Sequence, residues 1–284
     1  MNEGFFLLDR PGDATATPPR PREQALWCDI ERSALEAAAR EPSLRRQLSK
    51  TVLTPATPQA ILGAVLVRRL VSDRDDVATL RGLVAETLID DPALLPSVEA
   101  DLEAVSARDP ACRSPLHALL HFKGFHALQA HRVAHSLWRR GRHDAAAWLA
   151  SQTALALQVD IHPAVPFGRR VVIDHATGVV IGETAVVEDD VTIFHGVTLG
   201  YGERLHSDGT RSGGGNPVIE DDVWIGPHSM ILGPVTVGRG SRVGAGAVLL
   251  QSVPPRSVVV GNPGRIASTD CAPDVVNPWP AGNS

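Results

Sequence analysis

One spacing constrains the fold of this chain more than any other feature. In its second half, aliphatic residues recur at every sixth position. The longest series is Ile219, Ile225, Ile231, Val237, Val243 and Leu249. Earlier series are Ile181, Val187, Ile193 and Leu199, and before them Ile161, Phe167 and Ile173. A period of six predicts a parallel β-helix, in which three hexads make one triangular coil and the anchor residues stack in rows inside it.

The period breaks at two places, and both breaks are candidates for function. Between Ile173 and Ile181 the spacing is eight residues, and the break contains the sequence DHATG at 174–178. Between Leu199 and Ile219 the spacing is twenty, and residues 201–217 there are rich in Gly, Ser and charged side chains. We predict that 201–217 projects from the coil. The anchors and regular glycines are predicted to be core and corners.

The first half of the chain has a helical pattern. Residues 23–158 are rich in Ala, Leu, Arg and Glu and are interrupted by prolines, which predicts several short helices. Ser114 followed by Pro115 predicts a helix start, and Asp144 is predicted to cap a later helix. The fold class is therefore an N-terminal all-α domain over 23–158, followed by a parallel β-helix domain over 159–266. Residues 1–22 are predicted to be a flexible arm, and 267–284 a C-terminal tail.

Charge and cysteine content narrow the compartment and the partners. A net charge of −5 argues against a broad nucleic-acid surface. Cys28, Cys112 and Cys271 are too scattered for a disulfide framework or a zinc site, which favours free thiols in a reducing cytoplasm. We find no apolar run that is long enough to span a bilayer, so neither a membrane nor nucleic acid is expected as a partner.

His175 is the natural candidate for a general base at the first break. Its imidazole titrates near neutrality, and a carboxylate can hold its second ring nitrogen. Asp160 lies fifteen residues earlier, and coil stacking could bring the two side chains together. A histidine beside a β-helix corner is also compatible with a surface or interface role. The position of His175 at a break in the period favours catalysis.

A cofactor site is harder to locate. The glycines have neither a Walker nor a Rossmann pattern. A cofactor with phosphates would have to lie along a coil groove, with its phosphates near arginines that, taken one by one, we interpret as solvated surface charges. These arginines are Arg239, Arg242, Arg256 and Arg265.

Four segments carry a specific resemblance. They are KGFHALQAHR at 123–132, DIHP at 160–163, DHATG at 174–178 and GETA at 182–185. Together with the helical first half, they resemble the bacterial serine O-acetyltransferases of the hexapeptide-repeat class, whose β-helix is left-handed. The resemblance implies transfer of an acetyl group from acetyl-CoA to L-serine, in cysteine biosynthesis. It also implies a homo-oligomer, either a trimer or a dimer of trimers, of which we expect the dimer of trimers.

The resemblance also implies roles for individual residues. His175 would accept the proton of the serine hydroxyl while Asp160 orients it, and the hydroxyl oxygen would attack acetyl-CoA directly, without an acyl-enzyme. Asp109 and Asp174 would hold the amino group of serine. The backbone of Pro227 and of Ala245 would border CoA. Arg265 is the cation that we expect nearest the CoA phosphates.

Two departures from the family pattern stand out. Where the family has a short GGTGK loop and an Arg-His-Pro segment that meets the substrate carboxylate, residues 213–217 read GGGNP, without the Arg and the His. Within the longer loop, Arg204, His206 or Arg211 would have to supply the lost charge. The alternative is transfer to another hydroxy-amino acid, such as homoserine. The tail also ends in WPAGNS, without the isoleucine by which family members bind the cysteine-synthesising sulfhydrylase, so that complex is not expected.

Two other classes of function compete with this interpretation. Trimeric β-helices of the γ-carbonic anhydrase type bind zinc through histidines, and this region contains His162, His175, His195, His206 and His228. The sequence has no closely paired histidine motif, so we expect no metal. A catalytically silent binding scaffold is the third class. The presence of Asp109, Asp160, Asp174 and His175 argues against it.

Overall fold

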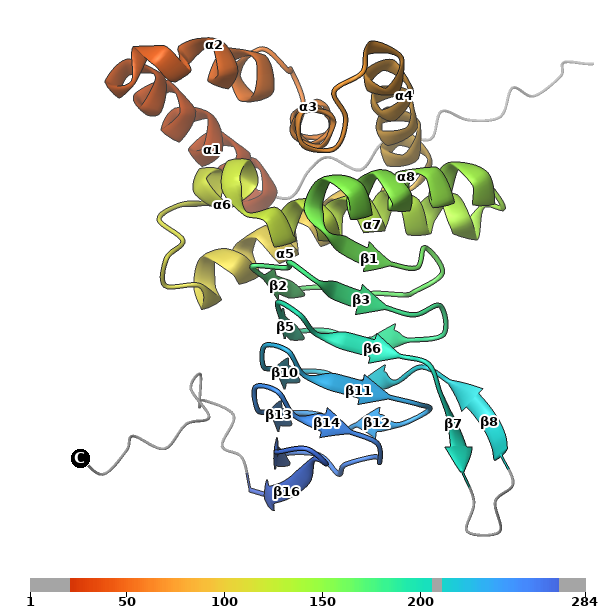
Figure 1. The fold of residues 1–284 in the computed structure, drawn as a ribbon. Coiled ribbons are helices and arrows are strands. Elements are labelled where there is room, and N and C mark those ends of the chain that lie inside the picture. Colours follow the sequence, from red (N-terminus) through yellow and green to blue (C-terminus); the bar gives the residue numbers. More distant parts are fainter. Residues whose placement is uncertain (1–20, 206–210, 271–284) are drawn as a thin grey trace, which may run out of the picture.

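The computed structural model describes residues 21–205 and 211–270 (Figure 1). An assembly of helices lies on one end of a stack of short strands. The described residues exclude 1–20 of the predicted arm and 271–284 of the predicted tail. They also exclude His206 and Cys271. Among the described helices, none is long and apolar enough to cross a membrane.

The helical part supplies the elements that cover the strand stack. Its elements are α1 Pro21–Arg40, η1 Pro42–Leu44, α2 Arg45–Leu48, η2 Ser49–Leu53, α3 Pro58–Leu70, α4 Arg74–Asp90, α5 Leu94–Arg108, α6 Pro115–His121, α7 Lys123–Arg139 and α8 His143–Leu157. The predicted start of α6 is confirmed, since Ser114 Oγ accepts a hydrogen bond from His117 N at 3.2 Å. The predicted cap at Asp144 is wrong. Arg142 is the N-cap of α8, and Asp144 lies in the first turn, where a carboxylate suits the helix dipole.

The strands form three sheets that make the faces of a triangular β-helix. One face contains β1 Val159–Ile161, β3 Val179–Ile181, β6 Thr198–Gly200, β11 Met230–Leu232 and β14 Val248–Leu249. The second contains β2 Val172–Asp174, β5 Thr192–Phe194, β10 Trp224–Ile225, β13 Arg242–Val243, β15 Val258–Val260 and β16 Arg265–Ser268. The third contains β4 Val186–Val187, β9 Val218–Ile219 and β12 Thr236–Val237. The predicted fold class is confirmed.

The register of these sheets explains the six-residue period. Ile161 pairs with Ile181, and Ile181 pairs with Leu199, so the anchors of one face stack coil upon coil. The same stacking joins Ile173 to Ile193 on the second face. The anchor side chains are buried, with Phe167 partly so. Stacked rows of buried aliphatic side chains supply the hydrophobic stabilisation of the coil.

Helix α7 lies on the first coil and joins the two parts of the molecule (Figure 1). A Cβ atom on Gly124 would lie 1.7 Å from the Ile173 carbonyl oxygen, so only glycine permits this close approach. Further along α7, Arg132 forms a buried ion pair with Asp101 of α5, with Nε 2.7 Å from Oδ2. Asp101 Oδ1 also accepts a hydrogen bond from Val171 N at 3.1 Å. The junction between the helical part and the β-helix therefore contains a buried ion pair of α5 and α7 that is hydrogen-bonded to the first coil.

The second break in the period forms a hairpin that leaves the stack (Figure 1). Its strands, β7 Gly202–Leu205 and β8 Arg211–Gly215, pair antiparallel. At its base, the buried Asn216 side chain accepts a hydrogen bond from Thr184 Oγ1 at 2.8 Å and donates one to the Leu199 carbonyl at 3.2 Å. Asn216 therefore fastens the base of the hairpin to the coil.

Candidate active site

A cavity of about 480 Å³ lies where the end of α5 meets the second face of the β-helix. The helical part contributes Asp109, and strand β2 contributes Asp174. Phe194 and Trp224, whose ring centroids are 4.6 Å apart, line the part of the cavity formed by β5 and β10. The cavity thus combines an aromatic wall with four carboxylates and two arginines, which are Asp109, Asp174, Asp190, Asp222, Arg108 and Arg242.

Asp109 reaches this cavity because α5 ends at the residue before it. Asp109 is the C-cap of α5, and its Oδ1 accepts a hydrogen bond from Ala111 N at 2.7 Å. The preceding Arg108 contacts Asp190 and donates to the Arg170 carbonyl oxygen at 2.9 Å. The Arg108 side chain thereby fixes the end of α5 against the β-helix. Two residues that are 65 positions apart, Asp109 and Asp174, thus face one space.

The two carboxylates influence each other electrostatically. Burial raises the pKa of Asp174, whose side chain is 24 % exposed, and the charge of Asp109 raises it further. The nearby His175 acts in the opposite direction. A cationic group placed between the two carboxylates would relieve their repulsion. Arg108 pairs with Asp190 and Arg242 pairs with Asp222, so among the described residues Asp109 and Asp174 are the lining carboxylates that no arginine neutralises. These two suit a protonated amine.

His175 lies in a tight turn that directly follows β2. Both His175 and Ala176 have left-handed backbone conformations, with φ of 57° and 61°. Ala176 N donates to the Asp174 carbonyl at 2.6 Å, and Thr177 N donates to the His175 carbonyl at 2.8 Å. Non-glycine residues in such conformations cost about 1–3 kcal/mol each and cluster at functional sites. The predicted break in the period is thus a strained turn that carries an imidazole.

The imidazole of His175 is 76 % exposed and faces Asp174 and His195. Its Nε2 is 3.9 Å from Asp174 Oδ1, and the ring centroid is 5.7 Å from that of His195. Asp160 lies on β1, opposite Val180 of β3, which is the strand that follows the His175 turn. Within residues 21–205 and 211–270, His175 and Asp160 share neither a hydrogen bond nor an ion pair. The stacking therefore places Asp160 on the strand that pairs with β3, and the His175 turn lies between β2 and β3, without a direct contact between the two side chains.

The residues expected to border CoA lie on adjacent turns. Gly246 N, next to Ala245, donates to the Pro227 carbonyl at 2.9 Å. Arg265 lies on β16 and is exposed. The interpretation of Arg242 as a solvated charge is wrong, because it is buried and pairs with Asp222 at 3.2 Å.

Arg239 and Arg256 are likewise engaged in ion pairs. They contact Asp221 at 3.1 Å and Asp270 at 2.8 Å. Among the four arginines considered for the CoA phosphates, Arg265 has no ion pair with any described residue.

The residues expected to replace the carboxylate-binding pair lie on the hairpin. The main chain of Arg204 is opposite Ser212, and that of Arg211 is opposite Leu205. The side chains of Arg204 and Arg211 lie outside what the structure describes. The hairpin thus carries both cations on neighbouring strands.

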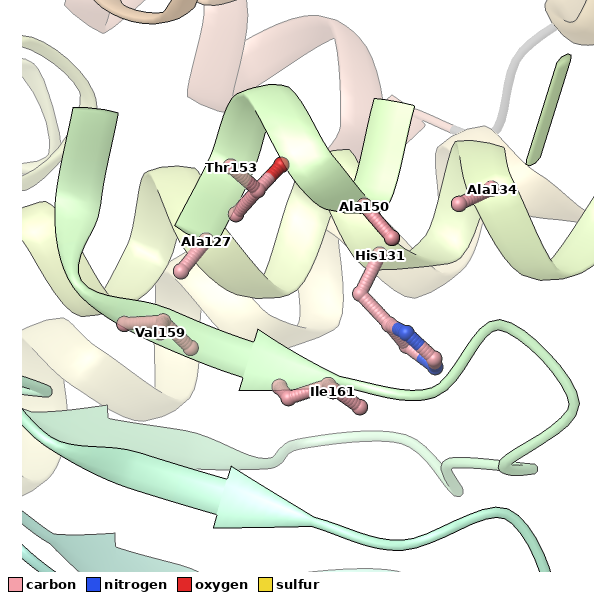
Figure 2. A pocket seen from close by; sticks show the side chains of 7 residues that line it. All are labelled: Ala127, His131, Ala134, Ala150, Thr153, Val159 and Ile161. Carbon is pink, nitrogen blue, oxygen red and sulfur yellow. The ribbon is translucent and has the colours of Figure 1, made fainter. Parts of the chain in front are cut away.

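A second, much smaller cavity of about 10 Å³ lies between α7, α8 and β1 (Figure 2). His131 extends beside it and is hydrogen-bonded through Nε2 to the Val165 carbonyl at 2.9 Å. Burial lowers the pKa of His131 to about 3. The other lining side chains are alanines, Thr153, Val159 and Ile161. This space is a packing void of the junction, with no room for a substrate.

Three of the histidines considered for zinc, His175, His195 and His228, are neighbours in successive coils. The rings of His195 and His228 meet edge to face with centroids 4.9 Å apart, and His162 Nδ1 accepts a hydrogen bond from Ala164 N. Residues 21–205 and 211–270 contain no group of three His, Cys, Asp or Glu side chains that could hold a metal ion.

Several residues at this site were not assigned roles from the sequence. Lys123 contacts Thr177 in the His175 turn, and Arg108 fixes the end of α5. Phe194 and Trp224 line the cavity. Their coil positions identify the last two as outward-facing strand residues. The long-range contacts of Lys123 and Arg108 leave no trace in local spacing.

Comparisons with known proteins agree with this geometry. The family model described as "Serine acetyltransferase, N-terminal" matches residues 26–130, and the model described as "Bacterial transferase hexapeptide (six repeats)" matches residues 216–251. A curated serine acetyltransferase of Salmonella typhimurium is 42% identical over 86% of this chain and 87% of its own length. The chain belongs to the serine acetyltransferase family. It is accordingly an acyltransferase.

Solved structures of serine acetyltransferases match the fold as well. A soybean serine acetyltransferase complexed with serine has a TM-score of 0.80 and 42% identity, covering 88% of this chain and 100% of that chain. A serine acetyltransferase in complex with CoA has a TM-score of 0.79 and 36% identity, covering 86% of this chain and 100% of that chain. The helical and β-helical parts are thus both shared with the serine acetyltransferase family.

Proposed function

We propose that the chain transfers the acetyl group of acetyl-CoA to the side-chain hydroxyl of L-serine, releasing O-acetyl-L-serine and CoA. The observation that carries this proposal is the meeting of Asp109 and Asp174 in one cavity beside the His175 turn. Two carboxylates suit the ammonium group of an amino acid. The adjacent imidazole suits the removal of a hydroxyl proton.

In this mechanism His175 acts first as a base and then as an acid. It takes the proton from serine Oγ while that oxygen attacks the thioester carbonyl carbon. The tetrahedral intermediate collapses by breaking the carbon–sulfur bond, and protonated His175 gives its proton to the leaving thiolate. The acetyl group moves directly from sulfur to oxygen. Asp160 orients the imidazole in the complex with both substrates, since catalytic hydrogen bonds often tighten only then.

CoA and the carboxylate of serine are assigned to different parts of the β-helix. The backbone at Pro227 and Ala245 borders CoA, and Arg265 lies on the C-terminal coil where the phosphates of an extended CoA would be neutralised. Arg204 and Arg211 of the hairpin bind the serine carboxylate in place of the Arg-His pair of the family. Charge-assisted hydrogen bonds of this kind are worth about 1.5–3 kcal/mol.

The same family assignment supports a proposal for the assembly and the compartment. We propose a dimer of trimers in which the β-helices form the trimers and the helical parts join them, in the cytoplasm. Cys28 and Cys112 are free thiols, as a reducing compartment requires. Sedimentation equilibrium of the full chain tests the assembly, and a mass of one or two chains would contradict it.

The decisive experiment is an initial-rate assay of CoA release from acetyl-CoA, with L-serine, L-homoserine and L-threonine offered separately. We expect kcat/KM for serine to exceed that for the other two by at least about 10-fold, since one extra methylene or methyl group changes discrimination by that order. Preference for homoserine would show that the hairpin has changed the acceptor. Release that is independent of any acceptor would contradict acyl transfer to a hydroxyl.

A further inference from the structure

The turn that carries His175 is unusual even within this β-helix. Left-handed residues occur singly at other corners, including Arg170, Asp190 and His228. In the described part of the chain, His175 and Ala176 are the one pair of consecutive non-glycine residues in this conformation. Such a turn persists only when its surroundings determine it. We therefore expect neighbouring residues to form contacts that stabilise the conformation of this turn.

The neighbouring coils hold the main chain of the turn. Gly178 N donates to the Gln158 carbonyl of the preceding coil at 2.8 Å. On the other side, Gly196 N donates to the Thr177 carbonyl at 2.8 Å. These are the ordinary backbone bonds of a β-helix, and they leave the side chain of Thr177 available for another contact.

That contact comes from the helical part of the molecule. Lys123, the first residue of α7, donates a hydrogen bond from Nζ to Thr177 Oγ1. The next residue, Gly124, lies so close to Ile173 of β2 that a Cβ atom there would overlap the Ile173 carbonyl. The start of α7 is thus pressed against the strand before His175 and is bonded to the turn after it.

Lys123 occupies a position that helices disfavour for a cation. It stands in the first turn of a 17-residue helix, where the dipole favours negative charge, and that turn contains no acidic residue. A cation in the first turn of a helix, with no acidic neighbour to offset it, indicates that the side chain has a role outside the helix. The hydrogen bond from Lys123 to Thr177 is such a role.

We propose that Lys123 is a positioning residue, which acts through Thr177 to hold the His175 turn in its reactive conformation. This inference rests on the proposed function of His175. Lys123 thereby makes the geometry of the base depend on the seating of α7 upon the β-helix. Its effect should appear in kcat, because misplacement of a reacting group by about 1 Å costs up to about 100-fold in rate.

The test compares Lys123→Met and Thr177→Val with Lys50→Met, Thr177→Ser and wild type, all as the full chain. Lys50 is the other lysine in the sequence and is exposed on η2, so its variant controls for loss of an amine. We expect Lys123→Met and Thr177→Val each to lower kcat about 10- to 100-fold, with KM for serine and acetyl-CoA within threefold and an unchanged Tm. Lys50→Met and Thr177→Ser should retain wild-type kcat.

The double variant separates positioning from a merely structural role. If Lys123 acts through Thr177, Lys123→Met with Thr177→Val loses no more kcat than either single variant, as expected for one shared interaction. Wild-type kcat in Lys123→Met, or losses that multiply in the double variant, would overturn the proposal. If Lys123→Met does not fold, Thr177→Val, which keeps the side-chain shape, decides. Full activity of His175→Ala would instead refute the proposed base and leave the Lys123 measurements to stand separately.

Discussion

The two breaks in the six-residue period are built in different ways. The first adds two residues at 174–178 and stays within the stack, bonded to the coil on each side and to α7. The second extends over 201–217 as a hairpin with its own backbone pairing, fastened at its base by Asn216. A short insertion takes its geometry from the rest of the molecule, whereas a long one supplies its own. The first therefore suits the reacting group, and the second suits substrate selection.

The largest expected effect tests the first break. His175→Ala should lower kcat by about 10²–10⁴, the usual contribution of a general base. The assay is CoA release at saturating serine, and His143→Ala, on the exposed start of α8, is the control. A loss of less than threefold in His175→Ala would remove the distinction between a catalytic short break and a regular corner.

The next effect tests the junction that supports the first break. Asp101→Asn leaves the Arg132 guanidinium buried without its ionic partner, and we expect the free energy of unfolding to fall by about 3–5 kcal/mol. Denaturant unfolding measures it. Asp144→Asn, an exposed change on α8, should stay within about 0.5 kcal/mol of wild type. Equal stability of the two variants would show that the junction does not depend on this pair.

A smaller effect tests the hairpin. Arg204→Gln and Arg211→Gln should each raise KM for serine about 10- to 100-fold, from the loss of about 1.5–3 kcal/mol, and leave kcat within about threefold. KM for acetyl-CoA should not change. Arg74→Gln on α4 is the matched control. A fall in kcat without a change in KM would assign the hairpin to catalysis rather than to selection.

The smallest effect concerns the pH dependence of the junction. Burial lowers the pKa of His131 to about 3 and that of His126 to about 4, from 6.5. Below pH 6.5 the unfolded chain therefore takes up protons that the folded chain does not, and stability is lost as pH falls. Each histidine should cost about 2 kcal/mol between pH 7 and pH 5. Denaturant unfolding of His131→Gln should show about half of this loss, and an undiminished loss would contradict the assignment.

Much of the fold could be predicted because a β-helix repeats one physical requirement. Every sixth side chain points into the stack, so the burial of Ile181, Ile193 and Ile225 could be predicted from the spacing alone. The start of α6 could also be predicted, because the signal for it is the adjacent pair Ser114 and Pro115. Asp144 failed as a cap because a carboxylate two residues further along still benefits from the dipole, and composition alone does not separate these positions.

The site was less predictable because its contacts join distant residues. The period break located His175, and the resemblance contributed Asp109 and Asp174. Spacing could not show that Arg108 fixes α5 against Arg170, or that Lys123 reaches Thr177. Nor could it distinguish Arg242, which is buried beside Asp222, from the exposed Arg265. Such contacts depend on how the helical part and the β-helix meet.

The covering of the β-helix ends has a further consequence. A stack of parallel strands has an unpaired edge at each end, and each edge is a template on which another chain can add strands. At one end α7 and α8 lie over the first coil, and at the other β16 runs antiparallel to β15, a direction that the next coil could not continue. The helical part and β16, the last strand among the described residues, therefore oppose the addition of further strands at the two ends of the stack.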